Sequence, residues 1–239
     1  MRQKIRRILL YVSLFLFPVT MNYLSPYVSL DGAFAGVLSG SAIVFVLLFL
    51  SGLFFGRAWC GWVCPAGGLG EVCQTVNPKP VNAKRLRIVR YSIFAVWFGV
   101  LVTGFVLAGG IKGVDPLRLT ERYISVDEPL KYIMYYLVLG LFFVLDLALG
   151  RRGACHSICW MSPFLSTGMA VGRLLHLPQM RIKAKAKECI DCKKCNSKCP
   201  MSIDVNAAVK TGSVKSYDCI LCGECVNVCP KAVLSYRKK

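Results

Sequence analysis

The sequence predicts a membrane α-helical protein with four transmembrane helices, joined to a small cysteine-rich α+β domain at the C-terminal end. Hydrophobic residues make up 55% of its 239 residues, whereas charged residues make up only 18%. Thirteen cysteines are present, and most of them are grouped at short, regular spacings. A disordered chain would be less apolar, and a small disulfide-stabilised domain would be shorter and would carry paired cysteines. Both of these classes are therefore excluded.

Four apolar runs carry the membrane prediction. They cover residues 8–24, 32–56, 91–111 and 132–150 and contain a single charged residue, Asp146. A hydrocarbon core of about 30 Å requires roughly 20 helical residues. The first run contains Pro18 and Asn22, and no small-residue cleavage site follows it. We therefore expect a retained helix there rather than a signal peptide.

The distribution of Lys and Arg predicts the orientation of these helices. All but four of the 30 Lys and Arg residues lie on the same side as the N-terminus. Because basic loops stay in the cytoplasm, we expect a multi-pass protein of the cytoplasmic (inner) membrane, with both termini and the cysteine-rich domain in the cytoplasm. This bias and the attraction to anionic lipid explain the formal net charge of +18, so no nucleic-acid partner is expected.

The C-terminal domain contains two copies of one cysteine pattern. Residues 189–200 and 219–230 both read C-x2-C-x2-C-x3-C-P, at an interval of 30 residues. This is the bacterial ferredoxin run, in which three cysteines hold one cubane and the fourth ligates the other cluster. We therefore predict two [4Fe-4S] clusters, one held by Cys189, Cys192, Cys195 and Cys229, and the other by Cys219, Cys222, Cys225 and Cys199. A zinc ribbon also uses paired C-x2-C units, but two complete four-cysteine runs argue against zinc.

Four further cysteines form a second pattern next to the predicted membrane helices. Cys60 and Cys64 follow the second apolar run, and Cys155 and Cys159 follow the fourth. A C-x3-C pair on a helical turn places both sulfurs on one face, so these residues, here called the C-x3-C quartet, offer four thiolates at one depth. Three interpretations stay open: a third iron–sulfur cluster, a redox-active dithiol or soft-metal site such as copper, and buried small side chains. Cys73 has no partner in the pattern, and a structural role is expected for it.

Three other polar residues are candidates for chemistry. Asp146 is the one acid inside a predicted span, and intramembrane acids often carry protons. Glu71 lies near Cys73, and His156 lies between the cysteines of the second C-x3-C pair, as a candidate ligand or proton carrier. Neither histidine of the chain lies inside a predicted span, so haem is not expected.

These patterns divide the chain into three segments. We expect a four-helix transmembrane domain over residues 1–150, including the first C-x3-C-P motif. Residues 151–187 contain the second C-x3-C motif, an interfacial helix over 161–177 and a basic linker over 183–187. Residues 188–239 form the domain for two [4Fe-4S] clusters.

Together these motifs resemble the NapH-type membrane-bound 4Fe-4S ferredoxin family. That family includes the quinol-oxidising ferredoxin subunit of periplasmic nitrate reductase systems and its relatives. The resemblance is most specific over residues 57–67 and 189–230, and it departs where Trp160, not proline, follows Cys159. It implies electron transfer between membrane and cytoplasmic redox partner proteins.

The favoured hypothesis is therefore an iron–sulfur electron carrier that exchanges electrons with the quinone/quinol pool, as a component of a quinol dehydrogenase system. Two other functions stay open at this point. The C-x3-C quartet could serve a copper-handling or assembly reductase, or the clusters could serve a redox sensor or membrane anchor.

Overall fold

The computed structural model describes residues 1–120 and 123–238. Its first part is helical, and it contains one small sheet in which β1 (Val37–Ser39) pairs in parallel with β2 (Gly113–Asp115). The helices are α1 (Arg2–Phe15), α2 (Phe17–Thr20), η1 (Asn22–Leu24), α3 (Pro26–Phe34), α4 (Gly40–Phe55), α5 (Ala58–Trp62), α6 (Pro65–Val76), α7 (Ala83–Leu107), α8 (Pro129–Leu149), α9 (Gly153–Ser157) and α10 (Met161–Leu174).

Two of these helices, among the described residues, are long and apolar enough to cross a membrane. They are α7, with 25 residues, and α8, with 21 residues. Most of their apolar side chains are not covered by protein, as expected for helices that face lipid. Both coincide with predicted spans, the third and the fourth.

The other two predicted spans take a different form. The run over residues 8–24 is divided into α1, α2 and η1, because Pro18 lacks the N–H group that would continue the helix. The run over residues 32–56 is interrupted by β1, and its helical part, α4, has only 16 residues. Four full-length membrane helices are therefore not observed in the described chain, and the count of four spans remains a prediction.

Helices α4 and α10 pack along each other through glycines. A Cβ atom placed on Gly168 would lie 2.2 Å from the Phe49 carbonyl oxygen, and one on Gly52 would lie 2.7 Å from the Leu165 carbonyl oxygen. Small residues of this kind let two helix backbones approach closely. The expected interfacial helix over residues 161–177 thus has one face buried against α4.

The C-terminal part is a small α+β domain. Its strands β3 (Met180–Ala184) and β4 (Leu234–Lys238) pair in antiparallel register, with Ile182 opposite Tyr236. The other elements are η2 (Ala186–Glu188), α11 (Lys194–Ser197), α12 (Val205–Lys210) and α13 (Glu224–Val228). Helices α11 and α13 begin at equivalent points of the two cysteine runs.

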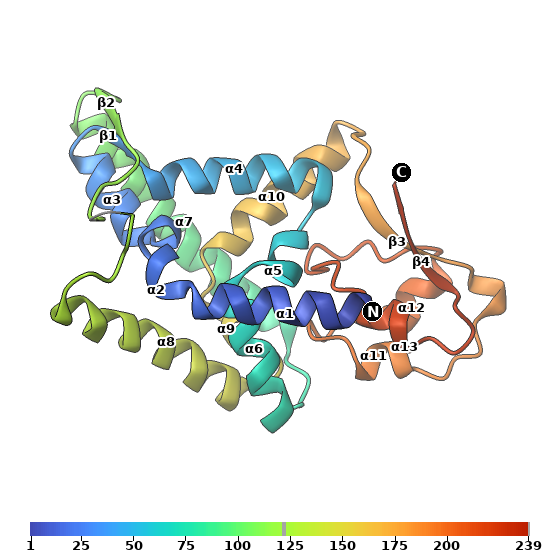
Figure 1. The fold of residues 1–239 in the computed structure, drawn as a ribbon. Coiled ribbons are helices and arrows are strands. Elements are labelled where there is room, and N and C mark those ends of the chain that lie inside the picture. The colour runs from blue at the N-terminus through green and yellow to red at the C-terminus, as the bar shows by residue number, and fades with distance from the viewer. Residues whose placement is uncertain (121–122, 239) are drawn as a thin grey trace.

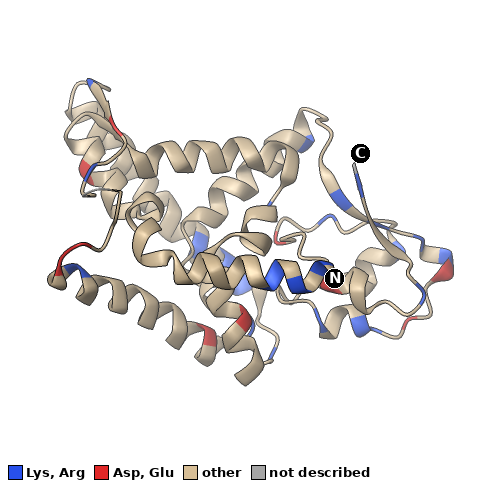
Figure 2. Cartoon of the chain, viewed as in Figure 1, with Lys and Arg blue, Asp and Glu red and all other residues tan. Residues whose placement is uncertain are grey.

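The C-terminal domain lies beyond one end of the helices, next to the N-terminus of α1 (Figure 1). Helix α5 joins the two parts: a Cβ atom on Gly61 would lie only 2.2 Å from the Ile220 carbonyl oxygen. One continuous core contains cysteines from both parts, among them Cys60, Cys159 and Cys222. Segments with Lys and Arg residues lie where the two parts meet and along the C-terminal domain (Figure 2).

The close approach of α4 and α10 gives a first testable prediction. Gly168→Ala should lower the free energy of unfolding by about 1–3 kcal/mol, because the added methyl group collides with backbone that cannot move aside. Gly99→Ala is the matched control, since no atom lies within 4 Å of the corresponding Cβ position. Thermal unfolding in detergent, followed by circular dichroism, compares the two variants. Equal melting temperatures would contradict the proposed helix contact.

Candidate iron–sulfur and redox sites

Each set of four cysteines predicted to hold a cluster in the C-terminal domain lines its own cavity. Cys189, Cys192, Cys195 and Cys229 line one cavity, here called the distal site. Cys199, Cys219, Cys222 and Cys225 line the other, here called the proximal site because it adjoins α5. In both sites three cysteines come from one run and the fourth from the other run, as the sequence predicts. The donor sets therefore fit two cubanes, each with four thiolates.

The backbone of the two runs repeats as closely as the sequence does. Left-handed φ values occur at Asp191 and Lys193 in the first run and at Leu221 and Gly223 in the second, again 30 residues apart. Such a conformation turns successive N–H groups toward one concavity, which favours a bound anion. The strain of a positive φ at three residues other than glycine is consistent with backbone shaped for a cluster.

The two sites differ in their exposure. At the proximal site Cys199, Cys222 and Cys225 are buried, whereas at the distal site Cys192 is exposed. Tyr236 lies beside the proximal run, where its hydroxyl donates to the Leu221 carbonyl oxygen at 2.8 Å. A Cβ atom on Gly223 would lie 2.2 Å from that hydroxyl, so glycine leaves room for the Tyr236 ring at a position where the first run has Lys193.

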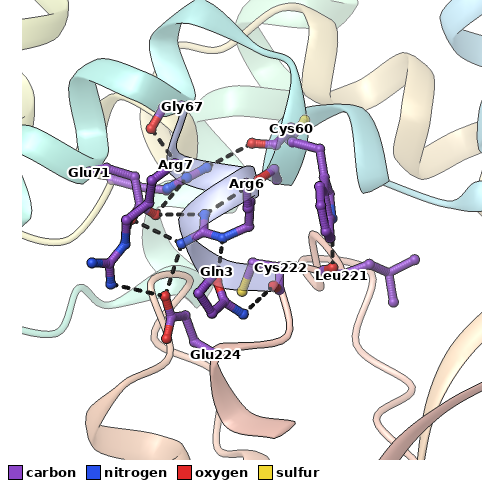
Figure 3. A network of polar contacts seen from close by, with 12 residues as sticks. Gln3, Arg6, Arg7, Cys60, Gly67, Glu71, Leu221, Cys222 and Glu224 are labelled. Atoms are coloured by element: carbon purple, nitrogen blue, oxygen red, sulfur yellow. Dashed lines mark hydrogen bonds and ion pairs between the residues drawn. The ribbon is translucent and has the colours of Figure 1, made fainter. Parts of the chain in front are cut away.

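Backbone carbonyl groups of the proximal run accept hydrogen bonds from the helical part. The indole Nε1 of Trp62 donates to the Leu221 carbonyl at 3.0 Å, and the amide Nε2 of Gln3 donates to the Cys222 carbonyl at 3.0 Å (Figure 3). These contacts hold the proximal site against α1 and α5. Helix α5 also carries Cys60.

Two clusters of buried ion pairs strengthen this contact. Asp218, directly before Cys219, accepts hydrogen bonds from Arg57 at 3.2 Å and Arg90 at 3.0 Å. Although burial opposes the effect, the charges of Arg57 and Arg90 lower the pKa of Asp218 to about 2. This carboxylate is therefore ionised and links α5 and α7 to the C-terminal domain.

The second cluster lies around Arg6, whose side chain is fully buried. Arg6 binds both oxygens of Glu71 at 3.0 Å and Glu224 at 2.9 Å (Figure 3). Arg152 adds a contact to Glu71 at 3.1 Å. Burial opposes the shift, but the Arg152 and Arg6 guanidinium groups lower the pKa of Glu71. Glu71, predicted as a candidate proton acceptor, is thus placed as an ion-pair partner.

The structure also brings the C-x3-C quartet together. All four thiols are buried. Burial, and after it the nearby Cys60 and Cys159 thiols, raises the pKa of the Cys64 thiol to about 12. Burial also raises the pKa of the Cys155 thiol, with contributions from Asp146, Cys159 and Cys64. Such thiols stay protonated unless a metal takes the thiolate form.

Three buried arginines surround the quartet, and the sequence predictions did not single them out. Arg152 donates to the Cys60 carbonyl oxygen at 2.8 Å, and Arg90 donates to the Cys155 carbonyl oxygen at 3.2 Å. Arg57 is close enough for the Cys60 thiol to raise its pKa, against the opposing effect of burial. Within the described residues, the Nε atoms of all three arginines have no hydrogen-bond partner. Arg57 and Arg152 each precede a C-x3-C pair by three residues, so the repeated R-x2-C-x3-C spacing could have revealed two of them.

Such a site suits an anionic group better than a single metal ion. A cubane with four thiolates carries a charge of about −2 when oxidised, which buried guanidinium groups would stabilise. In the described part of the chain, no three His, Cys, Asp or Glu side chains are arranged to hold one metal ion. In a cubane each thiolate binds a different iron, so its thiolates lie farther apart than the ligands of one ion.

The remaining two candidates lie beside the quartet. One oxygen of Asp146 accepts a hydrogen bond from the Ala154 backbone N–H at 2.8 Å, and the other has no partner among the described residues. His156 is fully buried, and burial lowers the pKa of its imidazole to about 3. His156 is therefore neutral at physiological pH.

A large apolar cavity of about 540 Å³ is lined in part by residues that directly follow two cysteines of the quartet. Pro65 and Ala66, which follow Cys64, line it on one side, and Trp160 and Met161, which follow Cys159, also line it. The rest of its wall comes mainly from apolar residues of α1, α2, α3 and α8, and the residues with polar groups are Asn22, Ser25, Tyr27, Ser125 and Lys131. The cavity was not predicted, because its wall combines segments far apart in the sequence.

Comparison with known proteins places these sites in a wider group. Residues 37–79 match a family described as a 4Fe-4S binding domain, and residues 181–230 match a 4Fe-4S dicluster domain. The chain is related to the ferredoxin-type 4Fe-4S proteins. No solved structure matches it.

Curated relatives include proteins from several bacteria that are named methylamine utilization ferredoxin-type protein MauN. The one from Paracoccus denitrificans is 30% identical over 187 residues, which cover 73% of this chain and 60% of the relative. The one from Methylorubrum extorquens is 28% identical over 198 residues, which cover 79% of this chain and 64% of the relative. The regulatory protein NosR of Stutzerimonas stutzeri is 26% identical over 66% of this chain but only 22% of its own length. The ferredoxin-type chain thus spans less than two thirds of these relatives, and its assignment to the NapH type remains a prediction.

The buried ion pairs of Asp218 give a second prediction. Asp218→Asn should destabilise the holoprotein by about 3–5 kcal/mol, because it leaves Arg57 and Arg90 buried without their counter-charge. The denaturant midpoint of the purified protein in detergent measures the effect.

Glu188→Gln is the matched control, since Glu188 precedes Cys189 as Asp218 precedes Cys219. Glu188 forms an exposed pair with Lys185, and such pairs contribute about 1 kcal/mol or less. Equal midpoints for the two variants would show that the Asp218 contacts do not hold the two parts together.

Proposed function

We propose that this chain is an integral membrane electron carrier. It transfers electrons between [4Fe-4S] clusters on the cytoplasmic side and quinone or quinol in the membrane. The order of its four sites is the observation that supports this function most directly. Burial raises the pKa of the Cys225 thiol at the proximal site, and Cys195 of the distal site is near enough to add to this shift. The proximal site contacts α5, and α5 carries a cysteine of the quartet. Residues that directly follow two cysteines of the quartet line the apolar cavity.

The residues of the chain have distinct roles in this function. A bound [4Fe-4S] group supplies one-electron transfer. The cysteines of the distal and proximal sites hold two such groups, while Trp62 and Gln3 keep the proximal site fixed on the helical part. The Tyr236 hydroxyl donates to the Leu221 carbonyl oxygen beside the proximal site, where Cys199, Cys222 and Cys225 are buried. Fixed neighbours and a dry environment reduce the reorganisation that accompanies a change of charge.

We further propose that the quartet holds a third [4Fe-4S] cluster. Cys60, Cys64, Cys155 and Cys159 supply the thiolates. Arg57, Arg90 and Arg152 supply positive charge that offsets the anionic group in a buried setting. The match of residues 37–79 to a 4Fe-4S binding family supports this proposal.

Iron and acid-labile sulfide content tests the third cluster. The wild-type protein should contain about twelve irons per chain, and Cys60→Ser with Cys155→Ser should contain about eight, because each cubane holds four. EPR of the reduced protein should lose one signal. Cys73→Ser is the matched control, since Cys73 is also buried but lies outside the quartet, and it should keep the wild-type content. About eight irons in all three proteins would refute a third cluster.

The apolar cavity provides the quinone site in this proposal. Its volume and its largely apolar wall with few polar groups are typical of sites for small hydrophobic ligands. Its lining extends from Pro65 and Trp160, which directly follow cysteines of the quartet, to Leu119 and Ser125 in the loop before α8. A quinone ring bound near Pro65 and Trp160 would lie beside the cysteines.

Filling the cavity should impair electron transfer to quinone. Val138→Trp should lower the rate at which a soluble quinone oxidises the dithionite-reduced protein by at least about tenfold, because the indole occupies space that the ring needs. Val144→Trp on the same helix is the control, since Val144 faces outward and is 60% exposed. Stopped-flow absorbance of the iron–sulfur bands measures the rate. Identical rates in both variants, with normal iron content, would place the quinone elsewhere.

A further inference from the structure

The two cysteine runs present equivalent surfaces, but only one of these surfaces is covered. In the second run Ile220, Leu221 and Cys222 are 2%, 5% and 8% exposed. The equivalent residues of the first run, Ile190, Asp191 and Cys192, are all exposed, and Ile190 is 56% exposed. The backbone of both segments has the same left-handed φ pattern, so the difference arises from their surroundings.

The covered surface is the one through which the domain docks on the helical part. The Ile220 carbonyl lies against Gly61, and the Leu221 carbonyl accepts the hydrogen bond from Trp62. This is the side of the proximal site nearest the quartet. The chain thus uses the loop between the first two cysteines of a run as the contact point between redox sites.

The exposed surface of the first run has the same backbone conformation as the covered surface of the second run, but it is more positively charged. Where the second run has Gly223, Glu224 and Val228, the first has Lys193, Lys194 and Lys198, all exposed. Lys193, Lys194 and Lys231 line the distal cavity itself. The nearby acids Asp191 and Glu188 already pair with Lys210 and Lys185. The surface around the exposed Ile190 therefore carries more lysines than acidic side chains.

We propose that this surface, formed by Ile190, Cys192 and Lys193, Lys194, Lys198 and Lys231, is the docking site of a small soluble redox protein with an acidic surface. Ile190 supplies the apolar centre and the lysines the charged rim of an interface. One electron leaves the partner's redox centre, which is oxidised, and enters the distal site, which is reduced; the reverse transfer follows the same route. The inference rests on the proposed electron-transfer function and names its second partner.

Charge complementarity selects this occupant. Opposite charges around two redox centres speed their encounter and orient it, and salt weakens the effect. The surface lies on the C-terminal domain, which extends beyond the ends of the helices (Figure 1). This position favours a soluble partner over lipid headgroups.

Reduced flavodoxin, a small acidic flavoprotein, is a suitable probe. The full-length holoprotein in nanodiscs of neutral lipid is mixed with the probe at several salt concentrations, and both the Kd and the second-order rate constant are measured. Lys194→Glu with Lys198→Glu should weaken binding and slow reduction at low salt at least about tenfold, and should remove the salt dependence. Glu is compatible with the fold at position 194, because Glu224 occupies the equivalent position.

Lys84→Glu with Arg85→Glu is the control, since it makes the same change of charge at the exposed start of α7 and should leave both values unchanged. Equal effects of the two double variants, or no dependence on salt, would overturn the proposal. A third outcome would also overturn the proposal. If reduction of the wild-type protein by flavodoxin is slower in anionic than in neutral nanodiscs, and the Lys194→Glu, Lys198→Glu variant shows no such slowing, the lysines contact lipid.

The two proposals can fail separately. Reduction by the probe needs only the distal site, whereas reoxidation by a soluble quinone needs the whole route. A protein that accepts electrons normally from flavodoxin but is not oxidised by any quinone would refute the quinone-linked function and leave the docking site intact. A protein that is oxidised by quinone but shows no lysine-dependent binding would refute only the docking site.

Discussion

The structure depends on burying positive charge beside cysteines. Arg6, Arg57, Arg90 and Arg152 are the largest fully buried side chains of the described chain. A buried guanidinium is costly unless it is paired and hydrogen-bonded, and the carboxylates of Glu71 and Asp218 supply only part of the compensation. Anionic clusters at the neighbouring cysteines would supply the rest. Arg6, Arg57 and Arg90 also pair with Glu224 and Asp218 of the C-terminal domain. Buried arginines therefore both join the two parts of the chain and place positive charge beside the redox sites.

This arrangement gives different roles to two nearly identical sequence repeats. The second run is held by Trp62 and by buried ion pairs, so its site is enclosed and fixed beside the quartet. The first run contacts the helical part through Arg151, which donates to the Asn196 and Cys199 carbonyl oxygens at 3.4 Å, but the loop that carries Cys192 is exposed. A duplicated domain with one enclosed site and one exposed site is suited to passing electrons from a soluble partner to a membrane site.

The sequence was sufficient for some features and not for others. Regular cysteine spacing predicted both four-cysteine sets, because each site forms from short local loops and one exchanged ligand. The spans at α7 and α8 were also predictable, since long uninterrupted apolar runs determine them. Hydropathy did not reveal that Pro18 ends α1 or that the run before α4 forms β1. Four of the arginines are buried in ion pairs that depend on tertiary contacts. Only Arg57 and Arg152 have a local signature, the R-x2-C-x3-C spacing, whereas Arg6 and Arg90 have none.

The linear order of the sites is the central claim, and removing the middle site tests it. The variant Cys222→Ala should lose the proximal cluster and keep the distal one, as checked by iron content and EPR. After complete reduction with dithionite, a soluble quinone is added and the spectra are recorded by rapid freezing. We predict that the distal cluster stays reduced while the quartet signal disappears at the wild-type rate. Oxidation of the distal cluster at the wild-type rate would contradict the proposed order of sites.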